Sequence, residues 1–160
     1  MYESYWGLKE KPFENTPDPR FFYYSPQHKE ALSRLLYAVR EKKGAALLSG
    51  EYGSGKTLLS RVLLEELKQE RYQVTLIFNP RLGVIEFFQE IIYQLGAQPN
   101  SNSKIELLHS LNKIFMDNHQ KNKNTVVLID EAQAIESDEV FEELRLLLNF
   151  QLNNEFLITL

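Results

Sequence analysis

The sequence contains no cysteine, which excludes disulfide bridges, iron–sulfur clusters and thiol catalysis. It also has little histidine, and His28, His109 and His119 are scattered without the spacing of a zinc site. An excess of positive charge is missing as well, because the formal net charge is -4. The overall charge therefore does not indicate a nucleic-acid-binding protein, and no direct contact with nucleic acid is expected.

Long apolar runs are also absent, since no stretch approaches the roughly 20 residues that a membrane-spanning helix needs. The first ten residues do not show the basic and then apolar pattern of a secretory signal. Both absences predict a cytoplasmic location. The chain of 160 residues is 43% hydrophobic and 25% charged, which is typical of one globular domain with a substantial core.

Apolar periodicity divides the chain into alternating strands and helices. Residues 1–24 are rich in aromatic residues and proline but show no periodicity, which predicts an irregular segment. The pattern predicts helices over 26–43, 56–69, 84–95, 104–119 and 137–150, and strands over 45–49, 73–78, 125–129 and 156–160. This order predicts an α/β fold of three layers with a parallel sheet. Because the fourth strand is still apolar at Leu160, the domain is expected to be truncated in or after that strand.

Local signals refine three of these elements. Ser25 followed by Pro26 is typical of a helix start. Ser103 with Glu106 forms a capping box that predicts another helix start. The strand at 45–49 is short, apolar and bounded by glycines, so it is predicted to be buried on both faces.

The loop Gly50–Thr57 (GEYGSGKT) fits the pattern G-x-x-x-x-G-K-[ST] and lies between a predicted strand and a predicted helix. Its glycines let successive backbone N–H groups point at phosphate oxygens, and the helix adds the positive end of its dipole. An ordinary glycine turn is the alternative, but four fixed positions in this context make it improbable by chance. A dinucleotide site is not supported, because the lysine belongs to triphosphate chemistry. The residues predicted to bind ATP are Gly50, Tyr52, Gly53, Ser54, Gly55, Lys56, Thr57 and Leu58.

Two side chains of the loop have separate predicted roles. Lys56 supplies a positive charge for the β- and γ-phosphates and is counted among the catalytic residues. The Thr57 hydroxyl is placed to coordinate Mg²⁺.

An acidic pair follows the strand predicted at 125–129. Asp130 is predicted to hold Mg²⁺, because a small hard cation prefers oxygen ligands. Glu131 is predicted to polarise the water that attacks the γ-phosphate. A solvated pair at a strand end is the alternative, but the phosphate loop favours catalysis. The predicted cofactors are therefore ATP and Mg²⁺, with Thr57 and Asp130 as the metal ligands.

With these motifs in place, nearly the whole chain resembles the AAA+ ATPases of the general secretion pathway protein A (ExeA-like) family. The resemblance rests on Tyr5-Trp6-Gly7-Leu8 with Pro12-Phe13, on Pro17-Asp18-Pro19 and the aromatic residues after it, on His28 to Leu36, on Asp130-Glu131-Ala132-Gln133, and on Leu144-Arg145-Leu146-Leu147 to Asn149. It implies one AAA+ domain over 1–160. It also implies that residues ahead of the first helix pass near the adenine, although packing on the sheet is an equal alternative for each aromatic.

The same resemblance implies a cytoplasmic ATPase that works as a homo-oligomer and helps to assemble a secretion or pilus apparatus. In the family this module precedes a membrane span, so contact with the inner membrane is expected only through segments outside 1–160. The helical lid, the sensor residue and the arginine finger are likewise expected outside it, and Arg145 is predicted to be a surface arginine. Two other functions remain open: a transposition-type ATPase that acts on DNA, and a nucleotide-dependent binding switch with negligible turnover.

Overall fold

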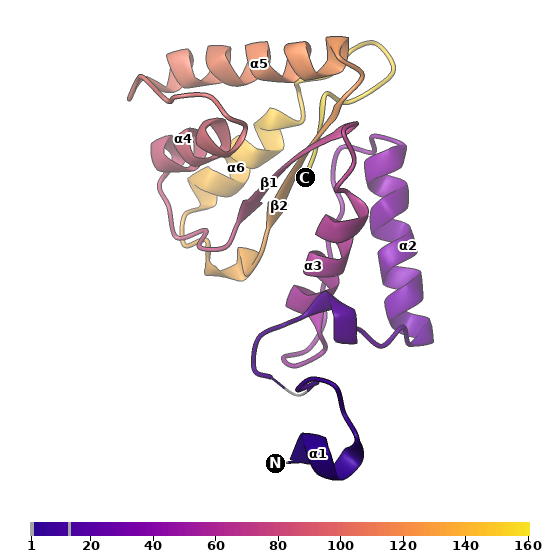
Figure 1. Ribbon diagram of the computed structural model, residues 1–160. Coiled ribbons are helices and arrows are strands. Elements are labelled where there is room, and N and C mark those ends of the chain that lie inside the picture. The colour runs from indigo at the N-terminus through magenta and orange to yellow at the C-terminus, as the bar shows by residue number, and fades with distance from the viewer. Residues whose placement is uncertain (1, 13) are drawn as a thin grey trace.

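The computed structural model describes residues 2–12 and 14–160 (Figure 1). Met1 and Phe13 lie outside the described residues, and Phe13 is one of the residues on which the family resemblance rests. The helices are α1 (Tyr2–Trp6), α2 (Pro26–Arg40), α3 (Lys56–Glu66), α4 (Val84–Gln94), α5 (Lys104–Gln120) and α6 (Asp138–Leu147). The strands are β1 (Tyr72–Ile77), β2 (Asn124–Ile129) and β3 (Ile158–Thr159), and two 3₁₀ turns are η1 (Pro19–Phe21) and η2 (Ala132–Ala134).

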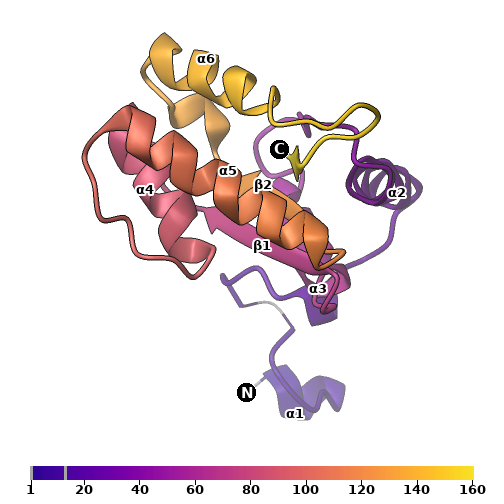
Figure 2. The ribbon, with the colours of Figure 1, turned by 90° about the horizontal axis from the view of Figure 1, so that it is seen from above.

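The three strands form a parallel sheet in the order β1-β2-β3. Tyr72 lies opposite Asn124 at one end of the first pair, and Ile77 lies opposite Ile129 at the other. Helices α4, α5 and α6 cover one face of the sheet, and α2 and α3 lie on the other (Figures 1 and 2). The predicted three-layer α/β class with a parallel sheet is confirmed.

Two separate apolar cores correspond to the two faces. The core under α4, α5 and α6 contains the most deeply buried side chains, including Phe87, Phe88, Ile91, Leu111 and Phe115, each at most 1% exposed. The core under α2 and α3 is smaller: the side chains buried in it are Phe22, Leu32, Val39, Leu59, Val62, Leu63, Leu67, Tyr72 and Val126. Amphipathic periodicity predicted the five helices α2 to α6 because each of them buries an apolar stripe.

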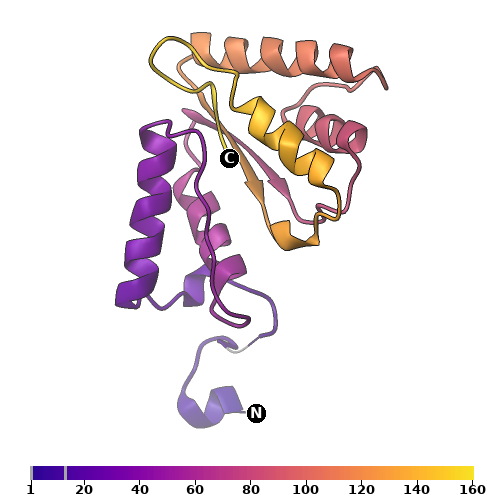
Figure 3. The ribbon, with the colours of Figure 1, turned by 180° about the vertical axis from the view of Figure 1, so that it is seen from behind.

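The segment 45–49 is extended but does not form the predicted buried strand. It lies beside β3 (Figure 3), where Ala46 N–H donates to Leu160 O at 2.8 Å and Leu160 N–H donates to Gly44 O at 2.7 Å. Within the described residues, these two bonds make a single rung of parallel pairing. Leu47 is 87% exposed, so the prediction of burial on both faces is wrong.

Two further predictions need correction. The first 24 residues are not wholly irregular, because Tyr2–Trp6 forms the short helix α1 and Pro19–Phe21 forms η1. A helix of five residues is too short to show a period, which explains why the sequence did not reveal it. Ser103 occupies the N-cap of α5, but its side chain makes no capping hydrogen bond, so the predicted capping box does not form. The Ser25 cap is confirmed.

None of the helices within 2–12 and 14–160 combines the length and the apolar character needed to cross a membrane.

Candidate functional site

The phosphate loop connects the segment 45–49 to α3. Gly53 and Gly55 have φ angles of 76° and 86°, in the left-handed region that glycine adopts without strain. Gly55 is the N-cap of α3, and Ser54 N–H donates to Glu51 O at 3.2 Å. A Cβ on Gly50 would lie 2.9 Å from Ser54 Oγ, so a side chain at position 50 would require the Ser54 hydroxyl to move. The loop therefore has the backbone that the motif requires.

The Lys56 ammonium group folds over the loop that precedes it. Its Nζ donates to Gly50 O and to Glu51 O, both at 2.9 Å. The first backbone hydrogen bond of the helix α3 runs from Leu59 N–H to Gly55 O at 2.8 Å. The N–H groups ahead of Leu59 have no partner within the helix, as at any helix start. A positive charge and free N–H donors thus gather at one place, which is what an anionic phosphate requires.

Three loop positions differ in how their side chains are placed. The Tyr52 side chain is fully exposed, at 105% of its reference area. Leu58 packs against the core under α2 and α3, so only its backbone is available to a phosphate. Thr57 is half-buried in the first turn of α3, and its carbonyl accepts a hydrogen bond from Ser60 Oγ at 2.9 Å.

The acidic pair follows β2 directly. Asp130 N–H donates to Ile77 O at 3.0 Å, so its backbone continues the pairing of β2 with β1. Its carboxylate accepts from Glu131 N–H at 3.0 Å. Glu131 has a φ of 52°, a left-handed conformation that is uncommon outside glycine. The Gln133 side-chain amide donates to the Glu131 carboxylate, which restrains this acid from the next turn.

The sheet brings the loop and the acids to one edge. Segment 45–49 runs parallel to β3, and β3 runs parallel to β2, so Gly50 and Asp130 both follow the carboxyl ends of parallel elements. Ligands bind at this edge in open α/β sheets. Within the described chain, no hydrogen bond or ion pair joins the loop to either acid. An ammonium group, a hydroxyl, two carboxylates and N–H donors at the same end of the sheet match the chemistry of a triphosphate with a hard cation.

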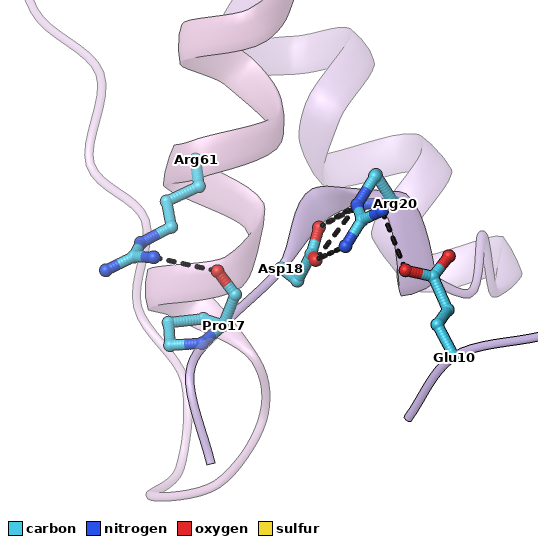
Figure 4. Close-up of polar contacts among 5 residues, drawn as sticks. All are labelled: Glu10, Pro17, Asp18, Arg20 and Arg61. Atoms are coloured by element: carbon cyan, nitrogen blue, oxygen red, sulfur yellow. Dashed lines mark hydrogen bonds and ion pairs between the residues drawn. The ribbon is translucent and has the colours of Figure 1, made fainter. Parts of the chain in front are cut away.

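The segment before α2 is tied to α3 by polar contacts (Figure 4). Arg61 Nη1 donates to Pro17 O at 2.8 Å. Asp18 caps η1 and binds the Arg20 guanidinium at 2.7 Å, and Arg20 also reaches Glu10 at 2.9 Å. The hydrogen bonds from Arg20 hold the pKa of the Asp18 carboxyl below its usual value, and Asp18 raises the pKa of Arg20. The Arg61 contact holds the segment against α3, and the Arg20 contacts link parts of the segment to one another.

Sequence reasoning missed two contacts of this site. From the sequence alone, His28 is considered only as a possible metal ligand and as the first residue of the stretch His28 to Leu36, but its Nε2 lies 3.0 Å from Ser54 O in the phosphate loop. Gln133 was quoted only as part of a motif, although it contacts the Glu131 carboxylate. The first contact joins residues far apart in the chain and had no local signal. The second was visible only as a polar side chain two positions after Glu131. Arg145, predicted to be a surface residue, pairs with Glu142 at 2.6 Å on the exposed side of α6.

A parallel α/β sheet with a glycine–lysine loop opening a helix at its carboxyl edge is the fold of a P-loop NTPase. The AAA domain family matches residues 14–160, and the chain belongs to that family.

The chain is also similar to General secretion pathway protein A of Aeromonas hydrophila. The two are 36% identical over 159 residues, which cover 99% of this chain and 29% of the relative's length. The resemblance to this AAA+ group, predicted from sequence motifs, is confirmed.

Proposed function

We propose that this chain binds ATP with Mg²⁺ at the loop Gly50–Thr57 and hydrolyses it with Glu131. One observation carries the proposal: the loop and the Asp130–Glu131 pair follow the carboxyl ends of parallel elements in one sheet. Left-handed Gly53 and Gly55 and the Lys56 ammonium support the same reading. Membership of the AAA domain family agrees with nucleotide binding.

The phosphates would be held by backbone donors and by Lys56. The N–H groups of Gly53, Gly55, Lys56, Thr57 and Leu58 lie in the loop or in the first turn of α3, where helices bind anions. Lys56, which now donates to two loop carbonyls, would turn part of its donor capacity to the β- and γ-phosphates. Tyr52 would contribute its backbone, because its side chain projects fully into solvent.

The metal would be held by the Thr57 hydroxyl and by Asp130. Oxygen ligands of this kind suit Mg²⁺, which keeps several waters of its own. When bound, the ion neutralises charge on the phosphate oxygens. Asp130 is well anchored for this role, because its backbone is part of the sheet pairing with Ile77.

Glu131 would orient a water molecule and accept its proton during attack on the γ-phosphate. Its left-handed backbone is the kind of strained conformation that clusters at functional sites. The contact from Gln133 limits the positions that the carboxylate can adopt. Both features support a role for Glu131 beyond that of a solvated surface acid.

Single-turnover hydrolysis with Mg²⁺ and ATP tests this assignment. We expect Lys56→Ala to weaken ATP binding, because it removes the charge that compensates the phosphates. We expect Glu131→Gln to keep ATP binding while hydrolysis falls by about 10²–10⁴-fold, the usual contribution of a general base. The matched control is Glu136→Gln, a nearby exposed acid that forms a 3.6 Å ion pair with Arg81.

Equal hydrolysis by wild type and the Glu131→Gln protein would remove Glu131 from the mechanism. Tight ATP binding without turnover in the wild type would instead favour a nucleotide-dependent binding switch. Failure of the folded wild type to bind ATP with Mg²⁺ would overturn the whole proposal.

The biological role that we propose is assembly of a secretion or pilus apparatus by a homo-oligomer at the cytoplasmic side of the inner membrane. Its support is the name of the relative, General secretion pathway protein A, of which this chain spans 29%. Light scattering of the Glu131→Gln protein with ATP and Mg²⁺ tests the oligomer, and a monomer under all conditions would contradict it. No observation favours a transposition-type ATPase.

A further inference from the structure

A single side chain, His28, joins the start of α2 to the phosphate loop. His28 Nδ1 lies 3.0 Å from Ser25 Oγ, and His28 Nε2 lies 3.0 Å from Ser54 O. Ser25 is the N-cap of α2, and its Oγ also accepts from His28 N–H at 3.2 Å. Both ring nitrogens are therefore engaged, one by the helix cap and one by the loop.

The hydrogen-bond partners define which ring nitrogen carries the proton. A backbone carbonyl can only accept, so the bond to Ser54 O requires Nε2–H as the donor. In the neutral ring Nδ1 is then an acceptor, and the Ser25 hydroxyl donates to it. Ser25 thus donates to the ring through its O–H and accepts the His28 N–H through a lone pair. The cap orients the ring so that its donor faces the loop.

Packing restricts the ring as well. A Cβ on Gly55 would lie 3.4 Å from His28 Nε2, so the ring rests close to the loop backbone at this glycine. On another side the ring tilts against Phe22, with ring centroids 5.2 Å apart. Phe22 is only 8% exposed and packs edge-on against Tyr24 at 4.8 Å. Part of the aromatic segment before α2 therefore supports the histidine.

The contact controls the orientation of a whole peptide unit. The Ser54 carbonyl and the Gly55 N–H belong to one planar trans peptide, in which C=O and N–H point in opposite directions. Holding the carbonyl toward α2 therefore directs Gly55 N–H away from α2. Gly55 has a φ of 86°, and glycine on either side of Ser54 leaves this peptide few restraints of its own.

We propose that His28 is a positioning residue of the phosphate loop: it holds the Ser54–Gly55 peptide so that Gly55 N–H is presented to a nucleotide phosphate. The inference rests on the proposed nucleotide binding at Gly50–Thr57. A loop that is already ordered loses less conformational freedom when a ligand binds, so the contact raises affinity without touching the ligand.

The test compares Mg²⁺–ATP affinity and nucleotide-free melting temperature across variants of the full chain. We expect His28→Ala to raise the Kd about tenfold, the scale of one lost hydrogen bond plus a loosened loop. His28→Gln should stay within about twofold of wild type, because its amide nitrogen reaches the place of Nε2. His28→Asn has the same amide one methylene shorter, cannot reach Ser54 O, and should bind like His28→Ala. His109→Ala, which removes an exposed histidine of α5, is the control.

The expected pattern is rescue by Gln but not by Asn, with similar melting temperatures for all folded variants in the absence of nucleotide. If His28→Ala does not fold, the Gln and Asn variants decide the question by the same comparison. Wild-type affinity in both His28→Ala and His28→Asn would overturn the role of His28 and leave the proposed function intact. Equal weakening in the Gln and Asn variants, with lower melting temperatures, would reduce His28 to a packing residue. No ATP binding by the wild type would overturn both proposals.

Discussion

The two faces of the sheet differ in what they contain. Under α4, α5 and α6 lies a large apolar core with side chains such as Leu111 and Phe115 at 0% exposure. On the other side, α2 and α3 enclose a smaller core and adjoin an exposed glycine loop with left-handed residues and a hydrogen bond from His28. Arg61 of α3 binds Pro17 in the segment before α2. Tight apolar packing contributes stability, whereas backbone N–H groups without a partner in the helix are what a phosphate can bind.

This contrast has a mutational consequence. Substitutions under α4, α5 and α6 should change the free energy of unfolding without changing the nucleotide affinity of the folded protein. Substitutions around the phosphate loop and the acidic pair should change nucleotide binding or hydrolysis with little effect on the free energy of unfolding.

The largest effect is expected from Phe115→Ala in α5. This ring is fully buried and packs edge-on against Phe150 at 5.5 Å, so its removal leaves a cavity. We expect a loss of about 3–5 kcal/mol in the free energy of unfolding, measured by urea denaturation. Ile105→Ala on the same helix is the control, because Ile105 is 66% exposed. A change in the ATP affinity of the folded Phe115→Ala protein would contradict the expectation that this face of the sheet does not affect nucleotide binding.

An intermediate effect is expected from Gln133→Ala. The substitution removes the contact that restrains the Glu131 carboxylate but leaves the carboxylate in place. We expect kcat for ATP hydrolysis to fall about tenfold, the scale of one hydrogen bond to a charged group, with KM unchanged. Gln69→Ala, an exposed glutamine after α3, is the control. A rise in KM with constant kcat would assign Gln133 to substrate binding instead.

The smallest effect is expected where the two faces are tied together by Glu155. Its carboxylate pairs with Lys42 after α2 at 2.7 Å and with His119 near the end of α5 at 3.2 Å. The hydrogen bond from Lys42 holds the pKa of Glu155 below its usual value of 4.5.

Because the folded-state pKa is lowered, the contribution of Glu155 is complete above pH 4.5 and is lost as pH falls below that value through the folded pKa. We expect it to stay below about 1 kcal/mol, since the pair is partly solvated. Thermal melts of wild type and Glu155→Gln should therefore differ at pH 7 and converge in acid. A difference that grows toward low pH would contradict this sign.

Elements defined by local pattern were predictable from sequence. Helices α2, α4 and α5 were each predicted to within a few residues at both ends, because the apolar stripe of a helix is recorded in its own sequence. Strands β1 and β2 were predicted because their apolar residues also stand close together in the sequence. The phosphate loop could be recognised because its glycines and lysine have a fixed spacing.

Features that depend on distant partners were not predictable. Whether 45–49 becomes a buried strand depends on which segments pair with it and pack against it, and the composition of 45–49 carries no such information. The contact between His28 and Ser54 likewise depends on how α2 lies against the loop. The left-handed backbone of Glu131 also escaped prediction, because a non-glycine residue in that conformation has no sequence signal.

The single rung between Ala46 and Leu160 also bears on the order of events during synthesis. The stretch that carries the phosphate loop leaves the ribosome early, but its only partner in the sheet is among the last of the described residues to emerge. Until then the segment before the phosphate loop lacks its hydrogen bonds to the sheet, while α4, α5 and β2 are already available to pack against one another. The ability to capture a nucleotide is therefore acquired only after the segment that ends at Leu160 has been synthesised.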